Sequence, residues 1–186
     1  MRDDIIALQL KIGASPDGFW GPKSIAATQK HLRRLMPAVN PWPKTDEKSL
    51  AEFYGAPGDE NQLVALNVEG LGIGYDGKPV TAMRCHKRVA ASLKRVLTEI
   101  SKGRHAKLLK HYAGCYNHRP MRGGTRPSLH ARGAAIDIDP ETNGLVTHWP
   151  MKATMPLEVM EAFAREGWLP AGAFWSRDAM HFQATQ

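Results

Sequence analysis

The spacing of apolar residues predicts two short helices at the start of the chain. Ile5, Leu8 and Ile12 recur at helical intervals, and Gly13 ends that segment. After the turn-rich stretch SPDGFWGPKS, a second apolar stripe with the same spacing predicts a helix over residues 23–35. The stretch PAVNPWPKTDEK follows, and its three prolines indicate a linker. We therefore expect a helical module over residues 1–40, a linker over 41–47 and a larger domain over 48–186.

The rest of the chain alternates between strand and helix patterns in an irregular order, which is typical of an α+β fold. Residues 82–101 carry the clearest apolar face with helical spacing, and Gly103 stands where that helix should end. The stretch AAIDID alternates apolar and acidic residues as a half-buried strand does. The expected strands cover residues 62–68, 108–116, 134–139 and 178–184, a hairpin covers 73–80 with its turn at Asp76-Gly77, and a further helix covers 155–167.

Composition and charge restrict the class of protein. An apolar content of 42% is ordinary for a globular domain, and no stretch reaches the ~18 apolar residues of a membrane span. The net charge of +7 suits an anionic polymer, but no run of Lys and Arg with interleaved aromatic residues indicates nucleic acid. The opening stretch MRDDIIALQLKIG lacks the apolar core of a secretory signal, so we expect the protein to stay in a cytoplasm until another factor releases it.

The cysteines and most of the histidines are expected to be structural or solvated. Cys85 and Cys115 lack the spacing of a zinc-binding pair. We expect two reduced, partly buried thiols, because cytoplasmic proteins rarely hold disulfides. The histidines expected at the surface are His31, His86, His105, His111, His118 and His148.

Two short stretches carry side chains that bind metals. In an extended AAIDID, Asp137 and Asp139 point to one face while the isoleucines point to the other. In DAMHFQ, His181 shares a face with Gln183, so adjacent strands would bring His181 to Asp137. His130 can reach in from the loop before AAIDID. Two histidines, one carboxylate and one open position are typical of a catalytic zinc.

Taken alone, a histidine followed seven positions later by an aspartate is more often structural than a pair of metal ligands. We expect Asp139 to be a turn or cap residue before Pro140 rather than a ligand. Only the combination of the two stretches indicates a metal site.

A water molecule activated by zinc needs a proton acceptor, and Asp178 lies three residues before His181. A tight turn over residues 178–181 would bring this carboxylate to the water, whose pKa a zinc ion lowers toward ~7. Arg119 and Arg122, in the loop upstream, are candidates for stabilising an oxyanion. Solvated loop charges explain these two arginines equally well.

Together the motifs resemble a known family. SLHARGAAIDID fits the pattern Ser-x-His-x-x-Gly-x-Ala-x-Asp, and DAMHF fits Asp-x-x-His-Phe, in the order typical of D-Ala-D-Ala carboxypeptidases, which are zinc metallopeptidases. The stretch YAGCYNHRPMRGG narrows the resemblance to phage endolysins that are L-alanyl-D-glutamate endopeptidases. The resemblance runs from about residue 48 to the C-terminus and implies a small antiparallel sheet flanked by helices.

This resemblance implies a role for each matching residue. His130, Asp137 and His181 match the three zinc ligands. Asp178 matches a general base that is often Glu in related enzymes, and Arg119 matches an arginine that stabilises the transition state. The residues implied on the substrate side are Arg122, Ser128 and Trp175, with Trp168 as a further candidate for the pocket wall.

The N-terminal part resembles a peptidoglycan-binding module of three short helices. ALQLKIGASPDGFWGPKSIAATQKHL matches its Leu-Gln, its Asp-Gly-x-x-Gly-Pro and the helix that follows. The signature turn consists of Asp17, Gly18, Trp20 and Gly21, although such turns also serve simply to hold helices together. The segment is short for this module, so its third helix either comes from residues 46–54 or is missing.

The leading hypothesis is a phage lysis enzyme that cleaves the peptidoglycan stem between L-Ala and D-Glu with water activated by Zn²⁺. We expect a monomer that waits in the host cytoplasm and then acts in the periplasm and cell wall, without nucleic-acid binding or stable membrane insertion. One alternative is a D-Ala-D-Ala carboxypeptidase or dipeptidase. Another is a non-catalytic zinc-containing wall-binding protein, similar to the Hedgehog signalling domain, and Asp178 argues against it.

Overall fold

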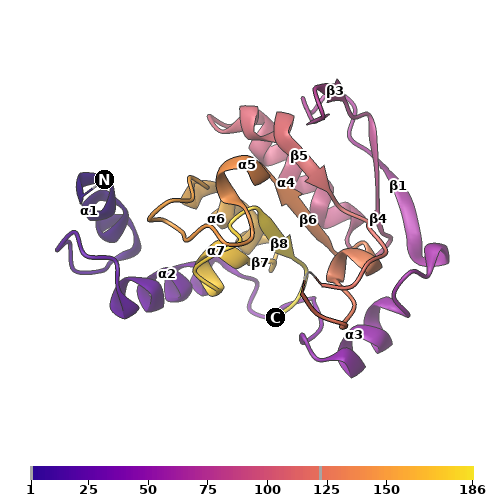
Figure 1. Cartoon of the computed structure of the whole chain (residues 1–186), viewed down its shortest axis with the longest axis horizontal. Coiled ribbons are helices and arrows are strands. Elements are labelled where there is room, and N and C mark those ends of the chain that lie inside the picture. The colour runs from indigo at the N-terminus through magenta and orange to yellow at the C-terminus, as the bar shows by residue number, and fades with distance from the viewer. Residues whose placement is uncertain (1, 122) are drawn as a thin grey trace.

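The N-terminal segment forms the two helices that the apolar stripes predict. The computed structural model describes residues 2–121 and 123–186, and Figure 1 shows it with both of these helices on one side. Helix α1 covers Arg2–Ile12 and buries Ile5 and Ile12. Helix α2 covers Pro22–Leu35 and buries Thr28 and Leu32, so both predicted helices are confirmed.

Residues 82–101 do not form the single helix that their apolar face predicts. Strand β4 (Ala82–His86) pairs antiparallel with β1 (Leu63–Asn67), and helix α4 (Ala90–Lys102) begins only after it. The prediction is wrong for the first residues because Met83 and Cys85 alternate with exposed neighbours, which is the period of a strand. The predicted helix end at Gly103 is confirmed.

The second pair of strands is the predicted hairpin. Strand β2 (Gly74–Tyr75) pairs with β3 (Lys78–Pro79) across the turn at Asp76-Gly77. Asp76 has φ +48° and Gly77 has φ +71°. Both central residues therefore adopt the left-handed conformation that tight two-residue hairpin turns require.

A four-stranded antiparallel sheet forms the centre of the molecule. Its strand order is β5-β6-β8-β7, and neighbouring strands run in opposite directions. The bounds are Tyr112–Gly114 for β5, Ala135–Ile138 for β6, Leu169–Pro170 for β7 and His181–Gln183 for β8. The strand predicted over residues 108–116 is much shorter, since the 3₁₀ helix η2 (Ala106–His111) takes its first half. The mixed α+β class and the small antiparallel sheet are confirmed.

Helices cover this sheet and complete the core. Helix α6 (Leu157–Arg165) confirms the predicted helix and places the Phe163 ring in a stacked contact with Phe182 of β8, with 4.0 Å between centroids. The remaining short elements are α3 (Glu47–Tyr54), η1 (Glu60–Gln62), η3 (Leu129–Arg132), α5 (Pro140–Asn143) and α7 (Ala171–Phe174). Among the described residues, no helix is long and apolar enough to cross a membrane.

The helical segment and the predicted linker both pack on the larger part of the chain. Helix α2 contacts α6 and α7, and Leu32 belongs to the same hydrophobic core as the sheet. Trp42 is buried, and its indole Nε1 donates a hydrogen bond to the carbonyl of Glu166 at 2.7 Å. The division at residues 41–47 stays a prediction, but the structure places these segments against one continuous core.

The surroundings of four side chains bear on the predictions. Trp168 is fully buried and donates from Nε1 to Ser92, so the prediction that it lines a pocket is wrong. His86 is buried rather than at the surface, because its ring bonds to the carbonyl of Tyr54 and to the amide of Arg88. Cys85 and Cys115 are free and buried, as predicted, and burial raises the pKa of the Cys85 thiol to about 12.

Candidate metal centre

Three predicted ligands converge where strands β6 and β8 lie side by side. Asp137 and His181 face each other in the register of the two strands, and His130 comes from η3 just before β6. The Oδ1 atom of Asp137 lies 2.9 Å from Nδ1 of His181 and 3.2 Å from Nε2 of His130. The two imidazole nitrogens are 3.1 Å apart. One nitrogen from each histidine and one carboxylate oxygen therefore meet at a single point.

The other nitrogen of each imidazole is held by a polar partner that fixes the orientation of the ring. Nδ1 of His130 lies 2.8 Å from the carbonyl oxygen of Cys115, which can only accept, so Nδ1 donates to this carbonyl and Nε2 faces the site. Nε2 of His181 lies 3.2 Å from Oε1 of Gln183, and the Gln183 amide donates to Oγ1 of Thr185. This chain leaves Nδ1 of His181 facing Asp137. Such outer partners are typical of metal-binding histidines.

Electrostatics at the site keep Asp137 ionised. Burial of this carboxyl would raise its pKa, but hydrogen bonds and positive charge from His130 and His181 hold the pKa well below its usual range. Burial likewise would lower the pKa of His181, but the hydrogen bond and charge of Asp137, together with the charge of Asp178, raise it. The site therefore keeps an ionised carboxylate beside the two imidazoles.

The donor set fits zinc. The three ligand atoms lie within 4.8 Å of one another, and two imidazoles with one carboxylate leave one coordination position for a water or substrate. A cavity of about 250 Å³ borders these residues and supplies room for that position. The residues present thus meet the requirements of a catalytic rather than a closed structural zinc site.

Asp178 borders the same cavity as Asp137 and His181, from the turn that leads into β8. The amide of His181 donates to the carbonyl of Asp178 at 2.9 Å, so residues 178–181 form the predicted tight turn. Asp178 has φ +59°, a left-handed conformation that Asp tolerates better than most residues. The turn therefore holds a carboxylate on the open side of the ligand cluster.

The residues predicted to contact the substrate or the transition state, where the structure describes them, line the same cavity: Arg119, Ser128 and Trp175. Ser128 is buried and accepts a hydrogen bond on Oγ from the amide of His130 at 3.3 Å, and its own amide donates to the carbonyl of Arg119. Trp175 is 44% exposed, and its ring stacks on His181 with 5.8 Å between centroids. Ser128 thus supports the ligand loop, and Trp175 forms an aromatic wall. Arg122 lies outside the described residues.

Several residues of the site carry no assigned role in the sequence prediction. Met121, Leu145 and Arg177 also line the cavity. Gln183 orients His181, and the alternation of DAMHFQ, which puts both side chains on one face, was the signal for it. The other partner, the carbonyl of Cys115, belongs to the main chain, so no side-chain pattern could have indicated it. Asp139 accepts hydrogen bonds on Oδ2 from Thr142 and Asn143, which confirms its predicted structural role.

The signature turn of the N-terminal segment joins α1 to α2. Oδ1 of Asp17 accepts hydrogen bonds from the amide of Phe19 and from Nε2 of Gln9, and the amide of Gly18 donates to Oε1 of Gln9. Gly21 stands at the N-cap of α2, and Trp20 meets the ring of Trp149 edge to face at 5.4 Å. These contacts hold the two helices together and attach the turn to the larger part of the chain.

Comparison with known proteins supports a metallopeptidase. Residues 122–184 match the family model described as D-alanyl-D-alanine carboxypeptidase. This range is about a third of the chain and includes His130, Asp137, Asp178 and His181, but neither Arg119 nor the N-terminal helices. No curated protein and no solved structure gives a match. The family match and the geometry of the ligands are separate observations, and both point to the cluster of His130, Asp137 and His181.

Proposed function

We propose that the chain is a zinc metallopeptidase that lyses bacterial cell walls for a phage, by hydrolysing the L-Ala–D-Glu bond of the peptidoglycan stem. The observation that carries this proposal is the convergence of His130, Asp137 and His181 beside Asp178 in an open cavity. The resemblance of YAGCYNHRPMRGG to L-alanyl-D-glutamate endopeptidases supports the choice of bond.

Each residue of the site has a part in this hydrolysis. His130, Asp137 and His181 would hold the zinc ion, which when bound supplies a Lewis acid that makes water nucleophilic and polarises the scissile carbonyl. Asp178 accepts the proton of the attacking water and returns it to the leaving amine. Arg119 borders the cavity and stabilises negative charge on the carbonyl oxygen, while Trp175 bounds the substrate.

The N-terminal helices would bring the enzyme to its polymeric substrate. Residues 1–44 hold seven Lys and Arg against three Asp and Glu, which favours the anionic surfaces of the wall and outer membrane. In this account the turn at Asp17, Gly18, Trp20 and Gly21 builds a wall-binding module. The protein acts as a monomer that remains in the host cytoplasm until release and then works in the periplasm and wall, without binding nucleic acid or inserting into a membrane.

A D-Ala-D-Ala carboxypeptidase or dipeptidase is the second candidate. The description of the matching family model favours it directly. The zinc ligands and base would be the same in both enzymes, and only the bond presented to them would differ. A non-catalytic zinc-containing wall-binding protein is the third reading, and the position of Asp178 at the open cavity argues against it.

Product analysis separates the three functions. Purified peptidoglycan is digested with the protein, and the new termini are identified by mass spectrometry. The proposal predicts new amino ends on D-Glu. Release of D-Ala alone would assign the carboxypeptidase, and the absence of any new terminus from zinc-loaded protein would assign the non-catalytic protein. Asp139→Asn is a suitable control, because Asp139 bonds to Thr142 and Asn143 rather than to the ligands.

A further inference from the structure

The loop that carries Asp178 has an uncommon backbone conformation. This base loop covers residues 175–180, between α7 and β8. Within it, Ser176 has φ +58° and Asp178 has φ +59°, which is the left-handed region that residues other than glycine adopt at a cost. Such a conformation persists where the surrounding structure fixes it. The supports of the base loop therefore determine where the Asp178 carboxylate lies.

The end of α5 and the segment that follows it hold the base loop on both sides of Asp178. Before Asp178, the carbonyl of Ser176 accepts a hydrogen bond from the amide of Trp149 at 3.1 Å. After Asp178, the amide of Met180 donates to the carbonyl of Asn143 at 3.0 Å. Because the base lies between these two attachments, a shift of the segment would shift the carboxylate as well.

Trp149 joins this segment to the N-terminal helices. Its side chain is buried, and its indole Nε1 donates to the carbonyl of Met155 at 2.8 Å. The ring of Trp20, in the turn between α1 and α2, meets the Trp149 ring edge to face with 5.4 Å between centroids. In Figure 1 the loop after α5 extends toward these two helices. Trp149 therefore contacts the N-terminal turn with its side chain and the base loop with its main chain.

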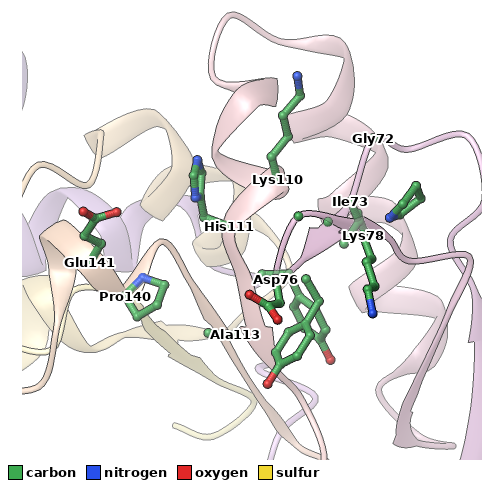
Figure 2. A pocket seen from close by; sticks show the side chains of 14 residues that line it. Gly72, Ile73, Asp76, Lys78, Lys110, His111, Ala113, Pro140 and Glu141 are labelled. Carbon is green, nitrogen blue, oxygen red and sulfur yellow. The ribbon is translucent and has the colours of Figure 1, made fainter.

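The start of α5 borders an open hollow. This hollow has a volume of about 950 Å³ and lies between α5, the β2–β3 hairpin and the end of η2. Figure 2 shows Pro140 and Glu141 of α5 across the hollow from Asp76 of the hairpin. Because the hollow separates α5 from the hairpin, the hairpin leaves the position of the segment to the packing around Trp149.

Helix α2 provides a second line of contacts to the base loop, through α7. Nε2 of Gln29 donates to the carbonyls of Ala173 and Phe174 at 3.3 and 3.4 Å. Helix α7 in turn packs closely on the base loop, since a Cβ atom on Gly172 would lie 2.7 Å from Cβ of Ala179. The N-terminal helices therefore reach the base loop by way of Trp149 and by way of α7.

We propose that Trp20 and Trp149 are positioning residues of the peptidase, through which the N-terminal helices hold the catalytic base in place. Trp20 packs against the Trp149 ring, and the Trp149 amide holds the carbonyl of Ser176. These contacts keep the Asp178 carboxylate on the open side of the ligand cluster. The helices thus serve the reaction itself in addition to wall attachment. This inference rests on the proposed role of Asp178 as general base, and it applies to whichever stem-peptide bond is cleaved.

Amide hydrogen exchange tests the support of the base loop without relying on cleavage. Trp20→Leu removes the ring that contacts Trp149, whereas Phe19→Leu removes a ring of the same turn that is 71% exposed. We expect Trp20→Leu to speed exchange at the amides of Trp149 and Met180 about tenfold, with no change at the paired strands β1 and β4. Phe19→Leu should leave all of these amides unchanged. Unchanged exchange in Trp20→Leu, or an equal increase at β1 and β4, would overturn the proposal.

Turnover of a short soluble stem peptide tests the effect on the reaction, because attachment to the wall does not limit the rate on such a substrate. We expect Trp20→Leu to lower kcat about 10–100-fold, since a small displacement of the base slows proton transfer, and to leave KM and zinc content unchanged. Phe19→Leu should keep full kcat. Trp20→Phe keeps an aromatic ring against Trp149 and should recover most of the rate. Full kcat for Trp20→Leu would overturn the proposal.

Combining Trp20→Leu with Asp178→Asn separates positioning of the base from a general effect on the fold. The Asp178→Asn protein has no base to displace, so Trp20→Leu should lower its residual kcat no further. A fall in kcat by the same factor with and without the Asp178 carboxylate would contradict the proposal, because the Trp20 contact would then act independently of the base.

The outcome is separable from the test of the proposed function. Release of D-Ala alone, combined with a lower kcat of Trp20→Leu for that release, would keep the positioning role and overturn the endopeptidase. New D-Glu ends, combined with equal kcat for Trp20→Leu and the unchanged protein, would keep the endopeptidase and overturn the positioning role.

Discussion

Gln183 determines which nitrogen of His181 faces the metal site. Its Oε1 atom accepts from Nε2 of His181 while its amide is engaged with Thr185, so the imidazole has one orientation with all its partners in place. At the scale of single residues, the site therefore depends on outer contacts as well as on the ligands. The same holds for His130 and the carbonyl of Cys115.

Gln183→Leu should weaken zinc binding by about 10–100-fold, because the substitution keeps the volume but frees the His181 ring to rotate. Zinc affinity is measured by competition with a chelator. Asp139→Asn is the control and should leave the affinity unchanged, since its partners are Thr142 and Asn143. If the Gln183→Leu protein bound zinc with unchanged affinity, the orientation of the His181 ring would not contribute to zinc binding.

Asp178→Asn should lower kcat by about 10²–10⁴-fold with zinc still bound, because the amide cannot accept the proton. Asn also tolerates the left-handed backbone of this position, so the fold should be retained. The measurement is the steady-state rate on a stem peptide, with zinc content determined on the same sample. A rate equal to that of the unchanged protein would remove Asp178 from the mechanism.

The sequence could predict that Asp137 and His181 meet because both residues lie on short strands. The period of two in AAIDID and DAMHFQ decides which side chains share a face, so the meeting of Asp137 and His181 follows once the strands are adjacent. Burial of His86 and Trp168 depends on elements far away in the chain, such as Tyr54 and Ser92. The sequence pattern around His86 or Trp168 contains no information about partners so far away in the chain.

Among the elements, the turn from η3 into β6 positions the ligand loop. Gly133 stands at the C-cap of η3 with φ +65°, and its amide donates to the carbonyl of His130. A Cβ atom there would lie 2.8 Å from the amide nitrogen of His86. The small residue therefore lets the loop that carries His130 pack against the end of β4.

Gly133→Ala should lower the free energy of unfolding by at least about 1–3 kcal/mol, because the left-handed backbone becomes strained and the β4 contact must open. Chemical denaturation measures this change. Gly103→Ala is the matched control: Gly103 has φ −93°, and its nearest neighbour to an added Cβ is a carbonyl oxygen 3.5 Å away. Equal destabilisation by the two variants would contradict the special role of Gly133.

The element boundaries show where sequence patterns reach their limit. The apolar face of residues 82–101 extends into Met83 and Cys85, which fit a helix and a strand alike. Pairing with β1 decides in favour of the strand, since the register from Leu63↔His86 to Asn67↔Ala82 satisfies the backbone groups of both segments. A pairing partner about 20 residues away lies outside any local window.

At the scale of the whole molecule, charged contacts join the N-terminal helices to the centre. Glu158 of α6 binds Lys11 of α1 at 2.9 Å and also contacts Arg104. Burial would raise the pKa of Glu158, but these partners lower it to about 2 from an ordinary value of 4.5. The folded state therefore binds this proton more weakly than the unfolded state does, so the contact stabilises the fold above pH 4.5 and is lost as the pH falls toward 2.

Glu158→Gln should accordingly destabilise the protein at pH 7 but not near pH 2. The measurement is the difference in free energy of unfolding between variant and unchanged protein at a series of pH values, and the difference should shrink below about pH 4.5. Glu52→Gln, on the exposed face of α3, should show no such trend. A difference that stays constant from pH 7 to pH 2 would contradict the role of the Glu158 charge.

The central claim is that His130, Asp137 and His181 bind one zinc ion that hydrolysis requires. Zinc content per chain, measured on the unchanged protein and on His181→Ala together with lysis of purified cell walls, tests it most directly. The account predicts one zinc per chain with full lysis for the former, and loss of both zinc and lysis for the latter. Undiminished lysis by zinc-free His181→Ala would contradict it.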